Sequence, residues 1–132
     1  MNNNYTNRLS RRSLLSYEEG LDAWKMEGID KKYGNLACHH FYDSLELALY
    51  YILLYNDVIV NAGDSNICEL LSKVPSKYHN KSWYKSILPI QNEVCKWKTD
   101  TIVKGFTFSV STVEKIIIVL SDLLNDISNR DI

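Results

Sequence analysis

Apolar residues recur at helical spacing in two long stretches of the chain. The first extends from Asn35 to Tyr55 and carries Leu36, Phe41, Leu45, Ala48, Leu49, Ile52 and Leu53. The second covers residues 111–128 and carries Val113, Ile116, Ile117, Leu120, Leu123, Leu124 and Ile127. Spacings of three and four residues place such side chains on one helix face, and both stretches are longer than a typical strand. The pattern predicts two long core helices.

A weaker pattern precedes the first of these stretches. From Ser13 onwards, one helix face would carry Leu14, Tyr17, Leu21 and Trp24. Two glycines, Gly20 and Gly28, lower the helix propensity here, and Gly34 is expected to mark a break or a bend. Residues 1–9 are rich in asparagine and are expected to be a disordered tail.

Two shorter helical segments are expected in the middle of the chain. Asp64 or Ser65 is expected to cap a short helix over residues 66–74, which has inward-facing positions at Ile67, Leu70, Leu71 and Val74, and Pro75 should end that helix. Residues 82–98 form a further helical segment with Pro89 inside it. Proline removes a backbone donor and clashes with the preceding turn, so a kink or two shorter helices are expected.

The start of the last helix carries a capping signal. The sequence Ser111-Thr112-Val113-Glu114 fits a capping box, in which two side chains satisfy free amides of the first turn. A loop is expected over residues 56–63, and residues 99–108 are compatible with an extended segment. The predicted fold is all-α: a four- or five-helix up-and-down bundle with two long core helices, forming one domain over residues 10–130.

Composition and charge agree with a globular domain. The 132 residues are 45% hydrophobic and 23% charged, with a formal net charge of -1. That net charge gives no global attraction to nucleic acid or to anionic membranes. Charge is uneven, however, because residues 72–105 contain seven lysines and two acids, whereas residues 1–71 contain six basic and ten acidic residues. A lysine-rich solvated face and a locally basic binding surface both explain this asymmetry.

The cysteines and the hydropathy pattern bear on the compartment. An odd number of widely spaced cysteines, at positions 38, 68 and 95, does not indicate a disulfide framework or a zinc site. The N-terminal segment has no apolar run, and the longest apolar run, Ala48–Tyr55, is too short to span a bilayer. We expect a cytoplasmic, reduced protein without a membrane segment, a metal or a cofactor.

One segment of the chain resembles a known family. Residues 37–54 read ACHHFYDSLELALYYILL, which resembles a helix of HEPN domains (higher eukaryotes and prokaryotes nucleotide-binding). The matching positions are Cys38, His40, Glu46, Ala48 and Leu49. A second stretch is similar at Ser65, Asn66, Ile67, Leu70 and Leu71, and the resemblance covers about residues 10–74 in pattern. It implies a helical bundle that binds nucleotides, RNA or a partner protein.

The chain also departs from that family. Tyr42 and Asp43 replace two glutamines, and Leu47 and Tyr50 replace lysines. Nuclease members carry an arginine four to six residues before a histidine, and no arginine here precedes a histidine at that spacing. The resemblance therefore implies a non-nuclease member, of the kind that pairs with a nucleotidyltransferase in toxin–antitoxin systems and often forms dimers.

The long helix over residues 35–55 supplies the first candidate site. Its polar and aromatic side chains with ligand-binding potential are His39, His40, Asp43, Glu46, Tyr42 and Tyr50. His39 and Asp43 are four residues apart and can pair on one face. If Glu46 is buried, a tyrosine or lysine from the first helix would be its partner, because an unpaired buried carboxylate is costly. Structural roles for all six side chains are the alternative.

A second candidate site lies in the lysine-rich region. Basic and aromatic side chains interleave there in the way that a single-strand nucleic-acid groove requires, at Lys73, Lys77, His79, Lys81, Trp83 and Lys85. Tryptophan in a small helical domain more often packs in the core. No glycine-rich phosphate loop or hydrolase motif occurs in the chain.

These observations predict a non-catalytic, HEPN-like module that binds a nucleotide, RNA or a protein partner. A homodimer through an apolar helix face is the expected assembly. Two alternatives remain. One is a divergent metal-independent RNase using the histidines at positions 39, 40 or 79. The other is a small helical subunit of a nucleoprotein or phage-defence complex.

Overall fold

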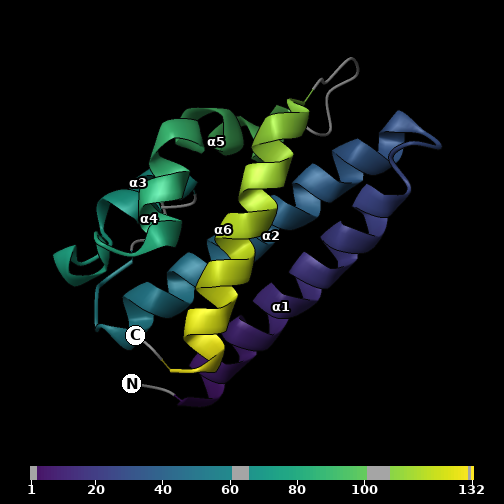
Figure 1. The fold of residues 1–132 in the computed structure, drawn as a ribbon. Helices are drawn as coiled ribbons and strands as arrows, with labels where there is room; N and C mark the ends of the chain where they lie inside the picture. The colour runs from purple at the N-terminus through teal and green to yellow at the C-terminus, as the bar shows by residue number, and fades with distance from the viewer. Residues whose placement is uncertain (1–2, 61–65, 101–107, 131) are drawn as a thin grey trace.

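The computed structural model describes residues 3–60, 66–100, 108–130 and 132 (Figure 1). These residues are mainly helical. The α-helices are α1 (Asn3–Lys25), α2 (Lys31–Tyr55), α3 (Ile67–Ser72), α4 (Ser82–Ile87), α5 (Gln91–Asp100) and α6 (Val110–Ser128). Two 3-10 turns, η1 (Ser76–Tyr78) and η2 (Leu88–Ile90), flank α4. The described residues contain no strand, and the prediction of an all-α bundle is confirmed.

The first two helices form an antiparallel hairpin (Figure 1). Asp30 ends the intervening turn and caps α2, because its carboxylate accepts a hydrogen bond from the backbone N–H of Lys32 at 3.0 Å. Near the middle of the hairpin the two helices approach closely at Gly20, where the ring of Phe41 lies against the glycine α-carbon. A side chain at this position of α1 would overlap that ring, so the glycine permits the close packing.

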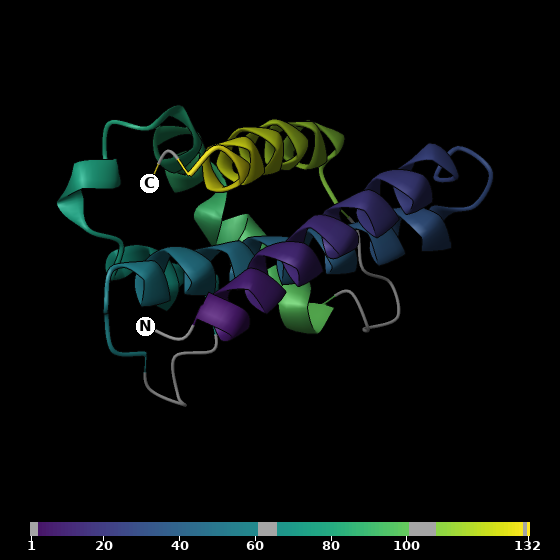
Figure 2. The ribbon, with the colours of Figure 1, turned by 90° about the horizontal axis from the view of Figure 1, so that it is seen from below.

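The core is centred on α2, which is flanked by α1, α3, α5 and α6. Figure 2 shows α6 lying over one face of the α1–α2 hairpin. The buried apolar residues of α2 are Ala37, Cys38, Phe41, Tyr42, Leu45, Ala48, Leu49, Tyr51, Ile52 and Leu53. Those of α6 are Val113, Ile116, Val119, Leu120, Leu123 and Ile127. The two predicted long helices are therefore confirmed as core elements, and α6 buries one face within the chain itself.

The expected disordered tail is wrong for residues 3–9, since α1 begins at Asn3. Leu9 is only 3% exposed, and its burial anchors the first turns against the rest of the bundle. The expected break at Gly34 is also absent, because Asp30 starts α2 earlier and the ring of Phe108 packs against Gly34. The bundle thus has three long helices, α1, α2 and α6.

The short helices follow the sequence signals closely. Pro89 divides the expected helix over residues 82–98 into α4, η2 and α5, as predicted. The inward positions of α3 are buried as expected, and its cap is Asn66, which accepts a hydrogen bond from the Glu69 N–H at 3.1 Å. The proposed caps Asp64 and Ser65, and nearly all of residues 99–108, lie outside the described residues.

The predicted capping box at Ser111 is wrong. Ser109 caps α6 and accepts a hydrogen bond from the N–H of Thr112 at 3.4 Å. The Thr112 hydroxyl donates to Glu93 of α5 at 2.6 Å, and Glu93 also accepts from the backbone N–H of Ser109 at 3.3 Å. The helix start is therefore fixed by a carboxylate from another helix, which a local pattern does not reveal.

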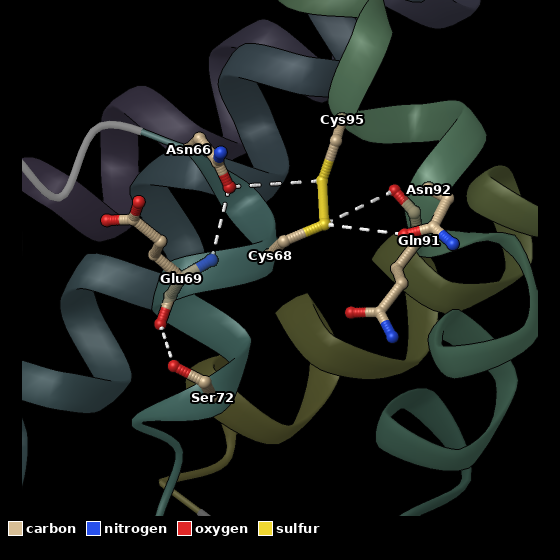
Figure 3. The surroundings of a disulfide bond; sticks show 7 residues. All are labelled: Asn66, Cys68, Glu69, Ser72, Gln91, Asn92 and Cys95. Carbon is tan, nitrogen blue, oxygen red and sulfur yellow. Dashed lines mark hydrogen bonds between the residues drawn. A yellow bond between two sulfur atoms is a disulfide. The ribbon is translucent and has the colours of Figure 1, made fainter.

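A disulfide joins Cys68 of α3 to Cys95 of α5, with their α-carbons 6.4 Å apart (Figure 3). This finding corrects the expectation of reduced cysteines. The odd cysteine is Cys38, which is buried in α2 and remains a free thiol. The odd number of cysteines is therefore made up of one disulfide pair and one thiol buried in the core.

Candidate functional site

A cavity of about 560 Å³ lies between α1 and α6. The residues that line it are Asn7, Ser10, Arg11, Leu14, Tyr17, Tyr51, Ser121, Asp122, Leu124, Asn125, Ile127, Ser128 and Arg130. We call this set the α1–α6 cleft. Its walls carry amides, hydroxyls and two guanidinium groups, and its volume lies within the range of small-molecule sites.

Two arginines give the cleft its charge. Arg11 lies on α1, whereas Arg130 follows the C-terminal cap of α6 at Asn129, and both side chains are exposed. Among the described residues, neither guanidinium has a carboxylate within ion-pair distance. Asp122 is the one acid in the lining, and its carboxylate accepts a hydrogen bond from the Ser82 hydroxyl at 3.3 Å.

Arg130 has an unusual backbone conformation. Its φ angle is 53°, in the left-handed region that glycine normally occupies after a helix. Its N–H donates to the carbonyl oxygen of Ile127 at 3.1 Å, which closes the last turn of α6. A residue with a side chain in this conformation costs roughly 1–2 kcal/mol. The arginine is therefore unfavourable for the backbone while its side chain lines the cleft, which is a reason to look for a function of that side chain.

Two tyrosines form the inner part of the cleft. The hydroxyl of Tyr17 donates to the carbonyl oxygen of Ile117 at 3.5 Å, and Tyr51 is buried with its ring stacked on Tyr55. Burial raises the pKa of both Tyr17 and Tyr51 above the ordinary value. The positive charge of Arg130 lowers the pKa of Tyr51 in part. Both hydroxyls are therefore neutral near pH 7 and keep their protons, and that of Tyr17 is already donated to Ile117.

None of the six candidate polar residues predicted on α2 lines this cleft. The predicted His39–Asp43 pair is confirmed, with Nε2 and the carboxylate 3.5 Å apart. His40 instead meets Glu19 of α1 at 3.4 Å. The two rings therefore have different acidic partners, and they contact each other edge to face with their centroids 6.2 Å apart.

Glu46, Tyr42 and Tyr50 have packing roles. The partner of Glu46 is Lys98 of α5 at 3.2 Å, not a residue of the first helix as expected. Tyr42 is 1% exposed, so its ring is unavailable for stacking on a ligand, and the ammonium of Lys98 lies 5.8 Å from the ring centroid. Tyr50 is half-buried against the core. The polar side chains of α2 therefore have several different partners, and a ligand-binding role for them stays a prediction.

The predicted nucleic-acid face is only partly open. Trp83 is 1% exposed, and its indole N–H donates to Asp126 of α6 at 3.2 Å. Lys81 pairs with the same carboxylate at 3.5 Å. The expected stacking role of Trp83 is therefore wrong, because the ring completes the α4–α6 contact.

The other members of this face lie nearer to solvent. His79 is exposed and stacks on Tyr84 with ring centroids 4.3 Å apart, and Lys77 lies 5.1 Å from the ring centroid of buried Tyr78. Lys85 is exposed and Lys73 is half-buried. A basic surface persists around η1, but its aromatic residues are engaged with one another.

Within the described ranges, no group of three or more histidine, cysteine, aspartate or glutamate side chains is placed to hold a metal ion. Among the same residues, no helix combines the length and apolar character needed to cross a bilayer.

The sequence did contain a signal for the α1–α6 cleft. All four arginines occur at positions 8, 11, 12 and 130, and the segment over residues 1–17 contains no acid. Arg11 and Arg130 lie near opposite ends of the sequence, so no local pattern links them. Only the tertiary fold brings Arg11 and Arg130 to the same cavity.

Comparisons with known proteins yielded no assignment. No protein-family model, curated protein or solved structure matches this chain.

Proposed function

We propose that this chain is a non-catalytic, HEPN-like binding module whose α1–α6 cleft holds a nucleotide. The observation that carries the proposal is that the guanidinium groups of Arg11 and Arg130 line one cavity and that neither has an acidic partner among the described residues. We assign both guanidinium groups to the phosphate of the proposed ligand.

The chemistry of the lining suits such a ligand. Guanidinium groups bind phosphate with two parallel hydrogen bonds, which lysines do not provide. Amide and hydroxyl groups at Asn7, Ser10 and Asn125 supply further donors and acceptors for a sugar or a base. The apolar surfaces of Leu14 and Tyr17 offer contact to a planar base.

The positions of the histidines support a non-catalytic role. No histidine belongs to the cleft lining, and His40 pairs with Glu19. Glu19 lies eight residues beyond Arg11, which is about 12 Å along α1 at the helical rise per residue. General acid–base catalysis requires a side chain within hydrogen-bond reach of the proton that it transfers. The arginines and the histidines thus serve separate parts of the surface.

The proposal extends to RNA. Arg8 and Arg12 are exposed on α1, near Arg11, and residues 3–17 carry no compensating acid. Like charges three and four residues apart on a helix repel by roughly 0.2–0.5 kcal/mol, and a bound polyanion would relieve that repulsion. A strand with one nucleotide in the cleft would meet these arginines with its neighbouring phosphates.

Self-association and a protein partner complete the proposal. Ile118 is 60% exposed on the outer side of α6, and it offers an apolar contact for a second copy of the chain or for a nucleotidyltransferase. We place the protein in the cytoplasm, where a disulfide of this kind would be transient or redox-sensing.

Binding of nucleoside 5′-monophosphates, measured by titration calorimetry, tests the proposal. Arg11→Gln and Arg130→Gln should each weaken binding about tenfold or more, since a hydrogen bond to a charged group contributes roughly 1.5–3 kcal/mol. Arg12→Gln is the matched control, because it removes the same charge from the same helix outside the cleft lining. Equal losses in all three variants would refute a specific site, as would the absence of binding to the wild-type chain.

A further inference from the structure

The disulfide encloses α4, which is one of the helices that pack against α6. Cys68 lies in α3 and Cys95 lies in α5, and η1, α4 and η2 occupy the chain between them (Figure 3). Both ends of this 27-residue separation are therefore joined covalently. A cross-link limits the conformations open to the enclosed segment. Whether the disulfide is closed or reduced therefore affects how much α4 can move.

The enclosed helix α4 contacts α6 through polar groups. The Ser82 hydroxyl donates to Asp122 at 3.3 Å, and the Trp83 indole donates to Asp126 at 3.2 Å. Lys81, which precedes α4, pairs with Asp126 at 3.5 Å. Asp122 belongs to the cleft lining. A continuous set of contacts therefore leads from the disulfide-closed segment to the cleft.

The surroundings of the two sulfur atoms suit a dithiol as well as a disulfide. Both cysteines are partly exposed. The carbonyl oxygen of Gln91 and the side-chain oxygen of Asn92 lie 3.8 and 4.0 Å from the Cys68 sulfur, and the Asn66 side-chain oxygen lies 4.0 Å from the Cys95 sulfur (Figure 3). Each thiol would therefore find an acceptor after reduction.

The remaining cysteine is a contrast within the same chain. Cys38 is buried, and burial together with the nearby Glu93 carboxylate raises the pKa of its thiol to about 12. Thiolates carry out disulfide exchange, so this group is inert near neutral pH. Redox chemistry is thus confined to the Cys68–Cys95 pair.

We propose that the Cys68–Cys95 bond is a reversible redox tether that regulates the affinity of the α1–α6 cleft. This inference rests on the proposed nucleotide-binding function. A dithiol reductant attacks one sulfur and forms a mixed disulfide, and its second thiol then displaces the protein thiolate. Two electrons pass to the protein pair, which takes up two protons, and the reductant leaves as a disulfide. Oxidised glutathione reverses the exchange in two steps.

The oxidised form is the one that binds more tightly. With the tether closed, α4 holds Asp122 and Asp126 in place, and α6 presents its cleft residues in a fixed arrangement. Reduction releases the segment between the two cysteines and loosens that arrangement. We expect the affinity for a nucleoside monophosphate to fall at least about fivefold, the lower end of typical couplings between sites.

The experiment uses the full chain oxidised with oxidised glutathione and the same chain reduced with dithiothreitol. Two quantities are measured in each form: nucleoside-monophosphate affinity and hydrogen exchange of the α4 amides. Slower exchange together with tighter binding in the oxidised form supports the proposal. The double variant Cys68→Ser/Cys95→Ser should match the reduced wild type and should not respond to dithiothreitol.

The outcomes separate this inference from the proposed function. If neither form binds a nucleotide, the proposed function fails, and the tether is then judged by exchange of the α4 amides alone. If both forms bind equally, the function stands and the regulation is refuted. Failure of the pair to oxidise in glutathione would overturn the tether itself.

Discussion

The buried hydroxyls of Ser13 and Ser44 form reciprocal hydrogen bonds across the α1–α2 hairpin. Ser13 donates to the carbonyl oxygen of Ser44 at 2.7 Å, and Ser44 donates to that of Ser13 at 2.8 Å. The two hydroxyl oxygens are 3.2 Å apart. Small polar residues therefore both fasten the helices and allow their backbones to approach closely.

Replacing either serine with alanine tests this contact. Ser13→Ala and Ser44→Ala should each lower the free energy of unfolding by about 1 kcal/mol, as expected for a buried hydrogen bond. The two effects should not add, since the hydroxyls share one network. Urea unfolding measures the free energy of unfolding of the two single variants and of the double variant. Ser86→Ala, at an exposed position of α4, is the control and should change little. Single variants that resemble this control would show that the hydrogen bonds do not stabilise the hairpin.

Gly20 and Gly28 should respond oppositely to alanine. A β-carbon at Gly20 would meet the Phe41 ring at 2.5 Å, whereas one at Gly28 meets nothing within 4 Å. Gly20→Ala should therefore destabilise the fold by roughly 1–3 kcal/mol through overpacking. Gly28→Ala should be neutral or slightly stabilising because it restricts the unfolded chain. Thermal unfolding of both variants checks the contrast, and a stabilised Gly20→Ala would contradict the close helix approach.

Arg130→Gly should separate stability from binding. Glycine adopts the left-handed conformation of residue 130 without strain, so stability should be unchanged or rise by up to about 1 kcal/mol. Nucleotide affinity should fall as it does in Arg130→Gln. The comparison requires unfolding curves and calorimetry on the same preparation. A loss of stability together with a loss of binding would assign Arg130 to the fold.

Counting reactive thiols under denaturing conditions should show whether the disulfide is present. The oxidised chain should react as one thiol and the reduced chain as three, because Cys38 is the only cysteine outside the pair. Closing a loop of this length should stabilise the fold by about 3–4 kcal/mol in the chain-entropy account. Denaturant unfolding of the two forms measures that difference. Three reactive thiols before reduction would contradict the pairing.

Purified protein should leave RNA uncut in the presence of a chelator. His39 and His40 have separate acidic partners, His79 is stacked on Tyr84, and none of the three lines the α1–α6 cleft. A labelled oligonucleotide followed on a gel checks this expectation. Metal-independent cleavage that disappears in His39→Ala or His40→Ala would support the RNase alternative instead.

Periodicity in the sequence was sufficient for the core helices. The apolar stripes that define α2 and α6 repeat over five or more turns, and local propensity and tertiary packing agree there. Pro89 divided its helix as expected, because loss of a backbone donor acts locally. Such features depend on neighbours within a few residues and are therefore accessible from one sequence.

The α1–α6 cleft could not be predicted from the sequence in the same way. Arg11 and Arg130 come together only through the packing of α1 against α6. The burial of Trp83 depends likewise on Asp126, which lies 43 residues further along. Partners so distant leave no periodic signal. The histidines and tyrosines of α2 stand out in the sequence, but His39, His40 and Tyr42 contact other side chains of the bundle and do not line the cleft.

The residues that line the cleft come mainly from α1 and α6, so a ligand held between Arg11 and Arg130 would link these two helices. A nascent chain would have no such site until residue 130 had been synthesised. Occupancy would then slow the fraying of α1 and α6 together.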